Sequence, residues 1–222
     1  MKHYAIIVAG GKGMRMKSAV PKQFMLLAGK PVLMYSIENF FKAIPKMEII
    51  VVLPAKEMAT WAKLCNKYSF TIPHKAVQGG KTRFHSVKNG LNEITEDGVV
   101  AVHDGVRPLA SVHLIKECFK EAIKKGNAVP CLPLNESLRK IKGKRNKVTD
   151  RNSIVAIQTP QCFESKILKK AYEVKYKEGF TDDASVVELY GKKIHLIEGG
   201  RENIKITTKF DLHFAESLLN KK

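Results

Sequence analysis

Apolar and polar positions divide the chain into two kinds of segment that alternate along it. The first kind is a short run of apolar, largely β-branched residues, found at 4–8, 48–53, 99–102 and 128–132. The second kind is longer and repeats its apolar residues at helical spacing, as at 31–41, 57–68 and 111–125. Strands that alternate with helices in this way are typical of βαβ units on a mainly parallel sheet. We therefore expect an α/β fold.

Residues with defined roles at helix ends sharpen these boundaries. Ser111 stands at the expected N-cap of one helix, and Gly126 stands where that helix ends. Thr208 and Asp211 form a capping pair for the last helix. Further elements are expected as strands at 71–77 and 193–198 and as a helix at 167–176.

The composition changes between residues 133 and 151, where two short strand-like pieces flank a basic tip containing Gly143. A hairpin that carries so many charges has little to bury against its own domain. We expect one domain over residues 1–222, with 133–151 as a protruding β-hairpin arm. For most of the charges at 142–147, a solvated loop is the simpler interpretation.

The chain has 39 Lys and Arg residues against 21 Asp and Glu, a formal net charge of +18 at pH 7. Such a charge raises the hypothesis of a nucleic-acid partner. The basic residues are spread along the chain, however, without a helix-turn-helix, zinc-finger or RNP pattern. A positive field also attracts small anionic substrates. We therefore expect no nucleic-acid partner.

The four cysteines have no Cys-x-x-Cys spacing, which favours structural thiols in a reduced, cytoplasmic protein. Met1 leads directly into a strand and not into the apolar region of a signal peptide. No apolar run approaches the ~20 residues that span a bilayer, so we expect no membrane association.

The first strand runs into a glycine-rich turn, Ala9-Gly10-Gly11-Lys12-Gly13-Met14-Arg15, and Lys22 follows shortly after. Glycines let the backbone approach a ligand closely, and main-chain N–H groups in such a turn form a cradle for phosphate oxygens. Neither the dinucleotide-binding pattern nor the P-loop pattern fits these residues. A loop with two cations and no nucleophile suits a triphosphate that is attacked at its α-phosphorus. The alternative is a tight strand-to-helix turn with solvated basic residues.

Two further segments point to the same edge of the sheet. Gly80 and Ser86 flank the start of a helix whose N-terminal amides would face a ligand. Asp104 and Arg107 follow a short apolar strand and reach the carboxyl edge, where open α/β sheets bind ligands. Asp104 is suited to orient a hydroxyl or a magnesium shell, and Arg107 to hold a phosphate bidentately. The alternatives are a helix serine bonded to backbone, an Asp–Arg pair at a turn and, for His103, a structural residue.

The motif Ala9-Gly10-Gly11-x-Gly13-x-Arg15-Met16, together with Pro21-Lys22-Gln23, resembles the signature of the sugar-phosphate nucleotidyltransferases. Later segments extend the resemblance over nearly the whole chain, most closely to the 2-C-methyl-D-erythritol 4-phosphate cytidylyltransferase family. The resemblance implies a Rossmann-like three-layer α/β/α sandwich of the nucleotide-diphospho-sugar transferase type, with a mixed, mainly parallel sheet. It also implies CTP as a substrate and Mg²⁺ held mainly by the CTP phosphates, with Asp104 as a candidate ligand.

The residues that match family motifs divide into three groups. The implied catalytic residues are Arg15, Lys22, Lys205 and Arg151. The implied nucleotide contacts are Ala9, Gly10, Gly11, Gly13, Gly80, Ser86, Asp104 and Gly105. The implied contacts to the sugar phosphate are Asp104, Arg107, Ser137, Arg151, Thr181 and Lys205. The family resemblance places Ser137 and Arg151 on an arm that enters the site of a second subunit, in a homodimer.

The sequence departs from the family pattern at a few positions. Lys81 stands where some relatives carry an acidic residue, Gly105-Val106 replaces two alanines, and Ser137 replaces a threonine but retains the hydroxyl. Asp182 and Asp183, which follow Thr181, are expected to be helix-start residues.

The resemblance implies transfer of CMP from CTP to 2-C-methyl-D-erythritol 4-phosphate, with release of pyrophosphate. Two alternatives stay open at this point. One is ribitol 5-phosphate cytidylyltransferase, which shares the loop, the Asp/Arg turn and the arm. The other is a nucleotide- or nucleic-acid-binding protein without turnover.

Overall fold

A mixed sheet of eight strands forms the centre of the molecule. The computed structural model describes residues 1–11 and 20–220. The strands lie in the order β10-β7-β11-β6-β1-β4-β5, and β12 pairs with β7. Their bounds are β1 Lys2–Val8, β4 Glu48–Leu53, β5 Lys75–Gln78, β6 Gly98–Asp104, β7 Asn127–Pro133, β10 Val155–Ile157, β11 Gln161–Glu164 and β12 Leu196–Glu198. The strands β6, β1, β4 and β5 run parallel, whereas β11 and β10 are antiparallel to their neighbours.

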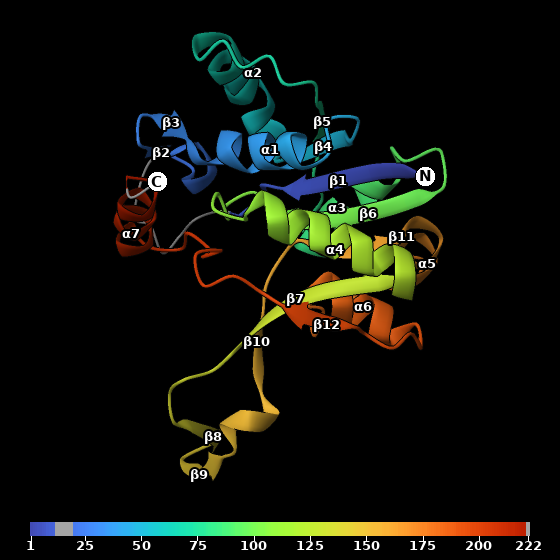
Figure 1. Ribbon diagram of the computed structural model, residues 1–222, viewed down its shortest axis with the longest axis vertical. Helices are drawn as coiled ribbons and strands as arrows, with labels where there is room; N and C mark the ends of the chain where they lie inside the picture. The colour runs from blue at the N-terminus through green and yellow to red at the C-terminus, as the bar shows by residue number, and fades with distance from the viewer. Residues whose placement is uncertain (12–19, 221–222) are drawn as a thin grey trace.

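Helices cover both faces of this sheet (Figure 1). Their bounds are α1 Val32–Ala43, α2 Met58–Lys67, α3 Arg83–Leu91, α4 Val112–Lys125, α5 Ser165–Ala171, α6 Asp183–Leu189 and α7 Lys209–Leu219. Because side chains alternate along a strand, Ala5 and Ile7 of β1 join the core beneath α1 and α4, whereas Tyr4 and Ile6 join the core beneath α3, α5 and α6. The three layers confirm the expected α/β class and sandwich architecture.

A third, smaller core lies beside the turn that follows β6. It joins α7 to the short β2–β3 pair (Leu26–Leu27 and Lys30–Pro31) through Leu27, Val106 and Ala215. This packing fixes the turn after Asp104 from behind.

The expected hairpin is present as β8 (Leu138–Lys142) and β9 (Arg145–Thr149), which pair antiparallel. Figure 1 shows it projecting far from the sheet, beyond β7 and β10. Its apolar residues Ile141 and Val148 are exposed. The arm therefore has no core of its own within one chain.

Several expected element boundaries were wrong by a few residues. The strand expected at 71–77 begins only at Lys75, because Pro73 has no N–H to donate to a ladder. The strand expected at 193–198 begins at Leu196. The helix expected at 167–176 spans Ser165–Ala171, and Tyr172 then turns into the core, where its ring stacks on Phe84 at 4.6 Å.

The expected helix ends are confirmed in both helices, α4 and α7, that carried a signal. Ser111 accepts the N–H of Leu114, and Gly126 ends α4 with φ +83°. Thr208 and Asp211 form a capping box at the start of α7. None of the described helices is long and apolar enough to cross a membrane.

Candidate active site

The polar and glycine-rich segments meet at the carboxyl edge of the parallel strands. Val8 at the end of β1 is in register with Asp104 at the end of β6. Gly10 follows β1, and Gly79 follows β5 on the other side of β4. Parallel neighbours thus bring segments that are far apart in sequence to one edge, as expected for a ligand site in an α/β sheet.

The first cleft at this edge has a volume of about 240 Å³. Eight residues implied by the family resemblance line it: Ala9, Gly10, Gly11, Lys22, Gly80, Ser86, Asp104 and Lys205. Gln23 and Arg83, for which the family resemblance implied no role, also line this cleft. A neighbouring cleft shares Gly10, Gly80 and Ser86 and extends to Pro54 and Glu57, so the cavity is long enough to follow an extended ligand.

The Gly79-Gly80 turn owes its shape to the helix that follows it. Thr82 N-caps α3 by accepting the N–H of His85. Ser86 donates to the carbonyl of Thr82 at 3.0 Å and accepts the N–H of Gly80 at 3.1 Å. A Cβ atom at Gly80 would overlap the Cβ atom of His85. Ser86 therefore bonds backbone, as the alternative interpretation held, and also lines the cleft.

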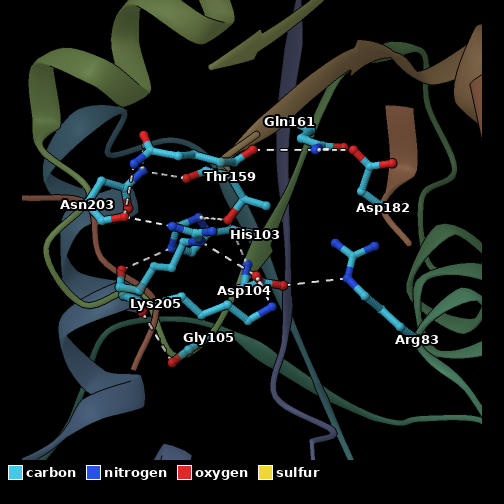
Figure 2. A network of polar contacts seen from close by, with 12 residues as sticks. Arg83, His103, Asp104, Gly105, Thr159, Gln161, Asp182, Asn203 and Lys205 are labelled. Carbon is cyan, nitrogen blue, oxygen red and sulfur yellow. Dashed lines mark hydrogen bonds and ion pairs between the residues drawn. The ribbon is translucent and has the colours of Figure 1, made fainter. Parts of the chain in front are cut away.

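Asp104 is the centre of a cluster of charges (Figure 2). The Nζ atom of Lys205 lies 2.8 Å from Oδ2 of Asp104, the Nε atom of Arg107 lies 3.6 Å from the same oxygen, and the Nε atom of Arg83 lies 3.5 Å from Oδ1. Burial alone would raise the pKa of Asp104, but the positive charges of Arg83 and Lys205 outweigh it and hold that pKa well below its usual range. The carboxylate is thus ionised and outnumbered by cations.

Arg83 is fixed from its other side by a second carboxylate. Its Nη1 and Nη2 atoms donate to the two carboxylate oxygens of Asp183 at 2.9 and 2.6 Å. The hydroxyl of Tyr172 donates to the same carboxylate at 2.6 Å. Burial alone would lower the pKa of Arg83, but Asp183 and Asp104 raise it, so the guanidinium stays charged.

Asp182 and Asp183 turn out to have different tasks. Asp182 caps α6 by accepting the N–H of Ser185, as expected of a helix-start residue. Asp183 is the first residue of α6, as expected, and its side chain is also fully buried against Arg83. The Gly-Gly-x-x-Arg spacing was the available signal for Arg83, but nothing local marks its distant partner.

His103 is buried behind Asp104 and is held in one tautomer. The carbonyl of Arg107 can only accept, so Nε2 of His103 donates to it at 3.2 Å. The Nδ1 atom then accepts from the hydroxyl of Thr159 at 3.0 Å, and the same hydroxyl oxygen accepts the N–H of Asp104 at 3.1 Å. Burial lowers the pKa of His103 to about 4. This geometry supports the structural role expected for His103.

Arg107 is buried and holds loops together. Its Nη1 atom donates to the carbonyl of Asn203 at 2.7 Å, and the Asn203 side chain donates to the carbonyl of Thr159 at 2.8 Å. Figure 2 shows this chain of contacts from Asn203 through Thr159 to His103. The turn after β6, the segment before β11 and the loop that carries Lys205 are therefore fixed relative to one another.

A second cleft of about 220 Å³ opens next to the first. It is lined by Arg83, Asp104, Arg107, Ile157, Gln158, Thr159, Gln161, Thr181, Asp182 and Lys205. The expected contacts Arg107 and Thr181 border only this cleft. Arg83, Asp104 and Lys205 border both clefts, so two ligands that occupy them meet at these three side chains.

The structure does not bring every expected residue to the clefts. Gly13 and Arg15 lie outside the described residues. Ser137 and Arg151 lie exposed at the arm, where Arg151 donates to the carbonyl of Asn135 at 2.6 Å. Gly105 lies behind the first cleft: its N–H donates to the carbonyl of Val8, and a Cβ atom there would come within 2.9 Å of Leu33.

The described part of the chain offers a divalent cation few side-chain ligands at the first cleft. No group of three or more His, Cys, Asp or Glu residues there could hold a metal ion. Asp104 is the one carboxylate among the described residues that line the first cleft. This donor set fits a hard cation that takes most of its oxygen ligands from a bound substrate and at most one from the protein.

Comparisons with known proteins agree with this arrangement. The sequence model of a family described as 2-C-methyl-D-erythritol 4-phosphate cytidylyltransferase matches residues 3–221. A Bacteroides fragilis protein of that name is 49% identical over 215 residues, which cover 97% of this chain and 98% of that protein. A Porphyromonas gingivalis protein of the same name is 49% identical and covers 98% of each chain.

The fold also matches that of a solved structure. The crystal structure of 4-diphosphocytidyl-2C-methyl-D-erythritol synthase from Anaerococcus prevotii superposes with a TM-score of 0.83 at 28% identity, covering 99% of this chain and 96% of that one. The resemblance noted from the sequence motifs is thereby confirmed. The chain belongs to the 2-C-methyl-D-erythritol 4-phosphate cytidylyltransferase family.

Proposed function

We propose that this protein transfers CMP from CTP to 2-C-methyl-D-erythritol 4-phosphate, forming 4-diphosphocytidyl-2-C-methyl-D-erythritol and pyrophosphate in non-mevalonate isoprenoid precursor synthesis. One structural observation carries the assignment beyond family membership: two adjoining clefts share Asp104 and Lys205. CTP would occupy the cleft lined by Gly10, Gly11 and Gly80, and the sugar phosphate the cleft lined by Thr181.

The chemistry asks for positioning and charge neutralisation. A phosphate monoester has a second pKa of ~6, so the acceptor is mostly dianionic at neutral pH and needs no general base. One of its oxygens attacks the α-phosphorus of CTP, the bond from that phosphorus to the bridging oxygen breaks, and pyrophosphate leaves with the electron pair. The barrier lies in bringing a dianion onto a polyanion.

Lys22 and Arg15 are the proposed groups that neutralise charge at the α-phosphate as the transition state forms. Lys22 lies in the short 3-10 turn Lys22–Phe24, and a Cβ atom at Gly11 would come within 3.3 Å of its Cε atom. The lysine stem thus runs against the glycine-rich turn, whose backbone N–H groups suit phosphate oxygens.

Mg²⁺ is proposed as the cation that accompanies CTP. When bound, it would screen the negative charge of the triphosphate oxygens. Asp104 would be its one candidate protein ligand in the described part of the first cleft. The principal contribution of the chain is then its cations and its backbone amides.

The acceptor would be held by side chains from two copies of the chain. Lys205, Thr181 and Arg107 border the second cleft from within one chain. We extend the proposal to a homodimer in which the arm brings Ser137 and Arg151 into the second cleft of its partner. The side chain of Ile141 on the arm is exposed in the single chain, which supports a dimer in which the second copy covers it.

The proposal also includes a cytoplasmic location and excludes a nucleic-acid partner. The four cysteines are all free, which fits the reducing cytoplasm. The positive charge of the chain is explained by attraction of anionic substrates, so the proposal includes no nucleic-acid partner.

The experiment that tests the proposal compares acceptors side by side. Pyrophosphate release is measured with CTP, Mg²⁺ and either methylerythritol 4-phosphate or ribitol 5-phosphate. We expect turnover that requires both substrates and prefers the methylerythritol ester. A clear preference for the ribitol ester would change the acceptor and retain the reaction type, whereas no turnover with salt-sensitive RNA or DNA binding would support the non-enzyme alternative.

A further inference from the structure

The described cationic side chains that line the second cleft differ in their exposure to solvent. The side chain of Lys205 is 41% exposed and that of Arg83 is 25% exposed, whereas that of Arg107 is 11% exposed. The Nη1 atom of Arg107 already donates to the carbonyl of Asn203. Of the two guanidinium groups that border this cleft, the one with more room for a ligand is Arg83.

The way Arg83 binds Asp183 leaves one edge of its guanidinium available. Asp183 takes the Nη1/Nη2 end, with one oxygen on each nitrogen. The other edge carries the Nε–H and the outer Nη2–H, two parallel donors that match two oxygens of a phosphate. Figure 2 shows this edge directed toward Asp104, and the Nε atom lies 3.5 Å from Oδ1 of that carboxylate. The Nε–H group is thus close to a negative charge without a short hydrogen bond.

The local charge balance favours an anion at this edge. Arg83, Arg107 and Lys205 surround Asp104, and the buried Asp183 offsets one of the three positive charges. Among the residues that the structure describes, only Arg83, Asp104 and Lys205 border both clefts. A phosphate placed between the clefts would therefore lie between an ammonium and a guanidinium edge.

We propose that Arg83 is a further substrate-contacting residue, which binds the phosphate group of the acceptor through its Nε/Nη2 edge and holds it for attack. Asp183 and Tyr172 hold the opposite end of the guanidinium, and this buried anchor contributes mainly to the stability of the fold. The assignment rests on the function proposed above and adds a residue to it.

The test separates a phosphate contact from a structural ion pair. Arg83→Lys keeps a positive charge near Asp183 but removes the two-donor edge. Asp183→Asn also breaks the buried ion pair, yet it leaves the guanidinium in the cleft. Arg201→Lys, at an exposed position in the loop after β12, is the matched control. For each protein the KM for the acceptor, kcat, the Kd for CTP and the Tm are measured.

We expect Arg83→Lys to raise the KM for the acceptor at least about tenfold, the loss expected for one charge-assisted hydrogen bond. Asp183→Asn should lower the Tm yet change that KM by less than about threefold, and the Kd for CTP should stay within about twofold in both variants. Equal KM effects of the two variants would overturn the assignment, as would an unchanged KM in Arg83→Lys.

If Arg83→Lys does not fold, the double variant Arg83→Gln/Asp183→Asn, which keeps a neutral hydrogen-bonded pair, gives the same decision. A wild-type protein without turnover would overturn the proposed function itself, which is a distinguishable result.

Discussion

The ammonium group of Lys205 lies 2.8 Å from the carboxylate of Asp104, and this pair stands where the two clefts adjoin. Asp104 ends the central strand β6, and Lys205 belongs to the loop between β12 and α7. The pair thus joins the carboxyl edge of the sheet to a segment near the C-terminus. Any reaction between ligands of the two clefts takes place beside it.

Lys22 is predicted to act mainly in the transition state. Lys22→Ala should lower kcat by at least ~100-fold and leave the Kd for CTP within a few-fold, because it removes a charge at the reacting phosphate and not the cradle of the triphosphate. Steady-state kinetics and equilibrium CTP binding measure the two quantities. Lys46→Ala, at an exposed position after α1, is the control and should match the wild type. Weaker CTP binding at an unchanged kcat would assign Lys22 to ground-state anchoring instead.

Gly80 is predicted to be required for nucleotide binding. A side chain there would overlap the Cβ atom of His85 and displace the turn whose N–H donates to Ser86. Gly80→Ala should raise the Kd for CTP by at least about tenfold, the equivalent of about 1.4 kcal/mol. Gly179→Ala is the matched control, since a Cβ atom at Gly179 meets no atom within 4 Å. Equal CTP affinity in the two variants would show that the turn tolerates the displacement.

The lowered pKa of His103 is predicted to make the stability of the fold depend on pH. Burial lowers its pKa from 6.5 to about 4 in the folded state, so between these values the unfolded chain binds more protons than the folded one. The free energy of unfolding should therefore fall as the pH falls through this window, by roughly 3 kcal/mol from His103 alone. Urea unfolding between pH 7 and pH 4 measures this slope. His103→Gln cannot gain the proton, so a slope as steep in the variant as in the wild type would contradict the account.

The sequence predicted those parts of the site that local patterns control. The apolar run before Asp104 predicts a buried strand, and the strand places Asp104 at the carboxyl edge. The Gly79-Gly80 turn and the N-terminus of α3 are likewise local features. Contacts between distant segments could not be predicted in this way, because nothing near Asp183 specifies that Arg83 will lie against it.

Tertiary packing also decided where α5 ends. Helical spacing continues beyond Ala171, but the buried ring of Tyr172 packs on Phe84 and its hydroxyl bonds Asp183. The buried position of Arg107 likewise depends on contacts between distant segments. Its motif predicts a phosphate contact, whereas burial and the bond to the carbonyl of Asn203 depend on a loop that folds back from the C-terminal part of the chain.

The arm is predicted to complete the active site of a second copy. The test mixes two inactive variants, Lys22→Ala and Arg151→Ala, under conditions that let subunits exchange. In a symmetric dimer with shared sites, each mixed dimer holds one doubly altered site and one intact site. Random pairing makes about half of the dimers mixed, so about a quarter of all sites should recover activity. No recovery despite demonstrated exchange would place Arg151 and Lys22 in the site of the same chain.

The central claim is that the phosphate of the acceptor attacks the α-phosphorus of CTP, and an isotope label tests it most directly. The non-bridging phosphate oxygens of methylerythritol 4-phosphate are labelled with ¹⁸O, and the products of the reaction with CTP and Mg²⁺ are analysed by ³¹P NMR and mass spectrometry. The account predicts that all of the label stays in the diphosphate product, with one ¹⁸O in the bridge between its two phosphorus atoms, and that pyrophosphate carries none. Label in the pyrophosphate, or a product without the labelled bridge, would contradict the account.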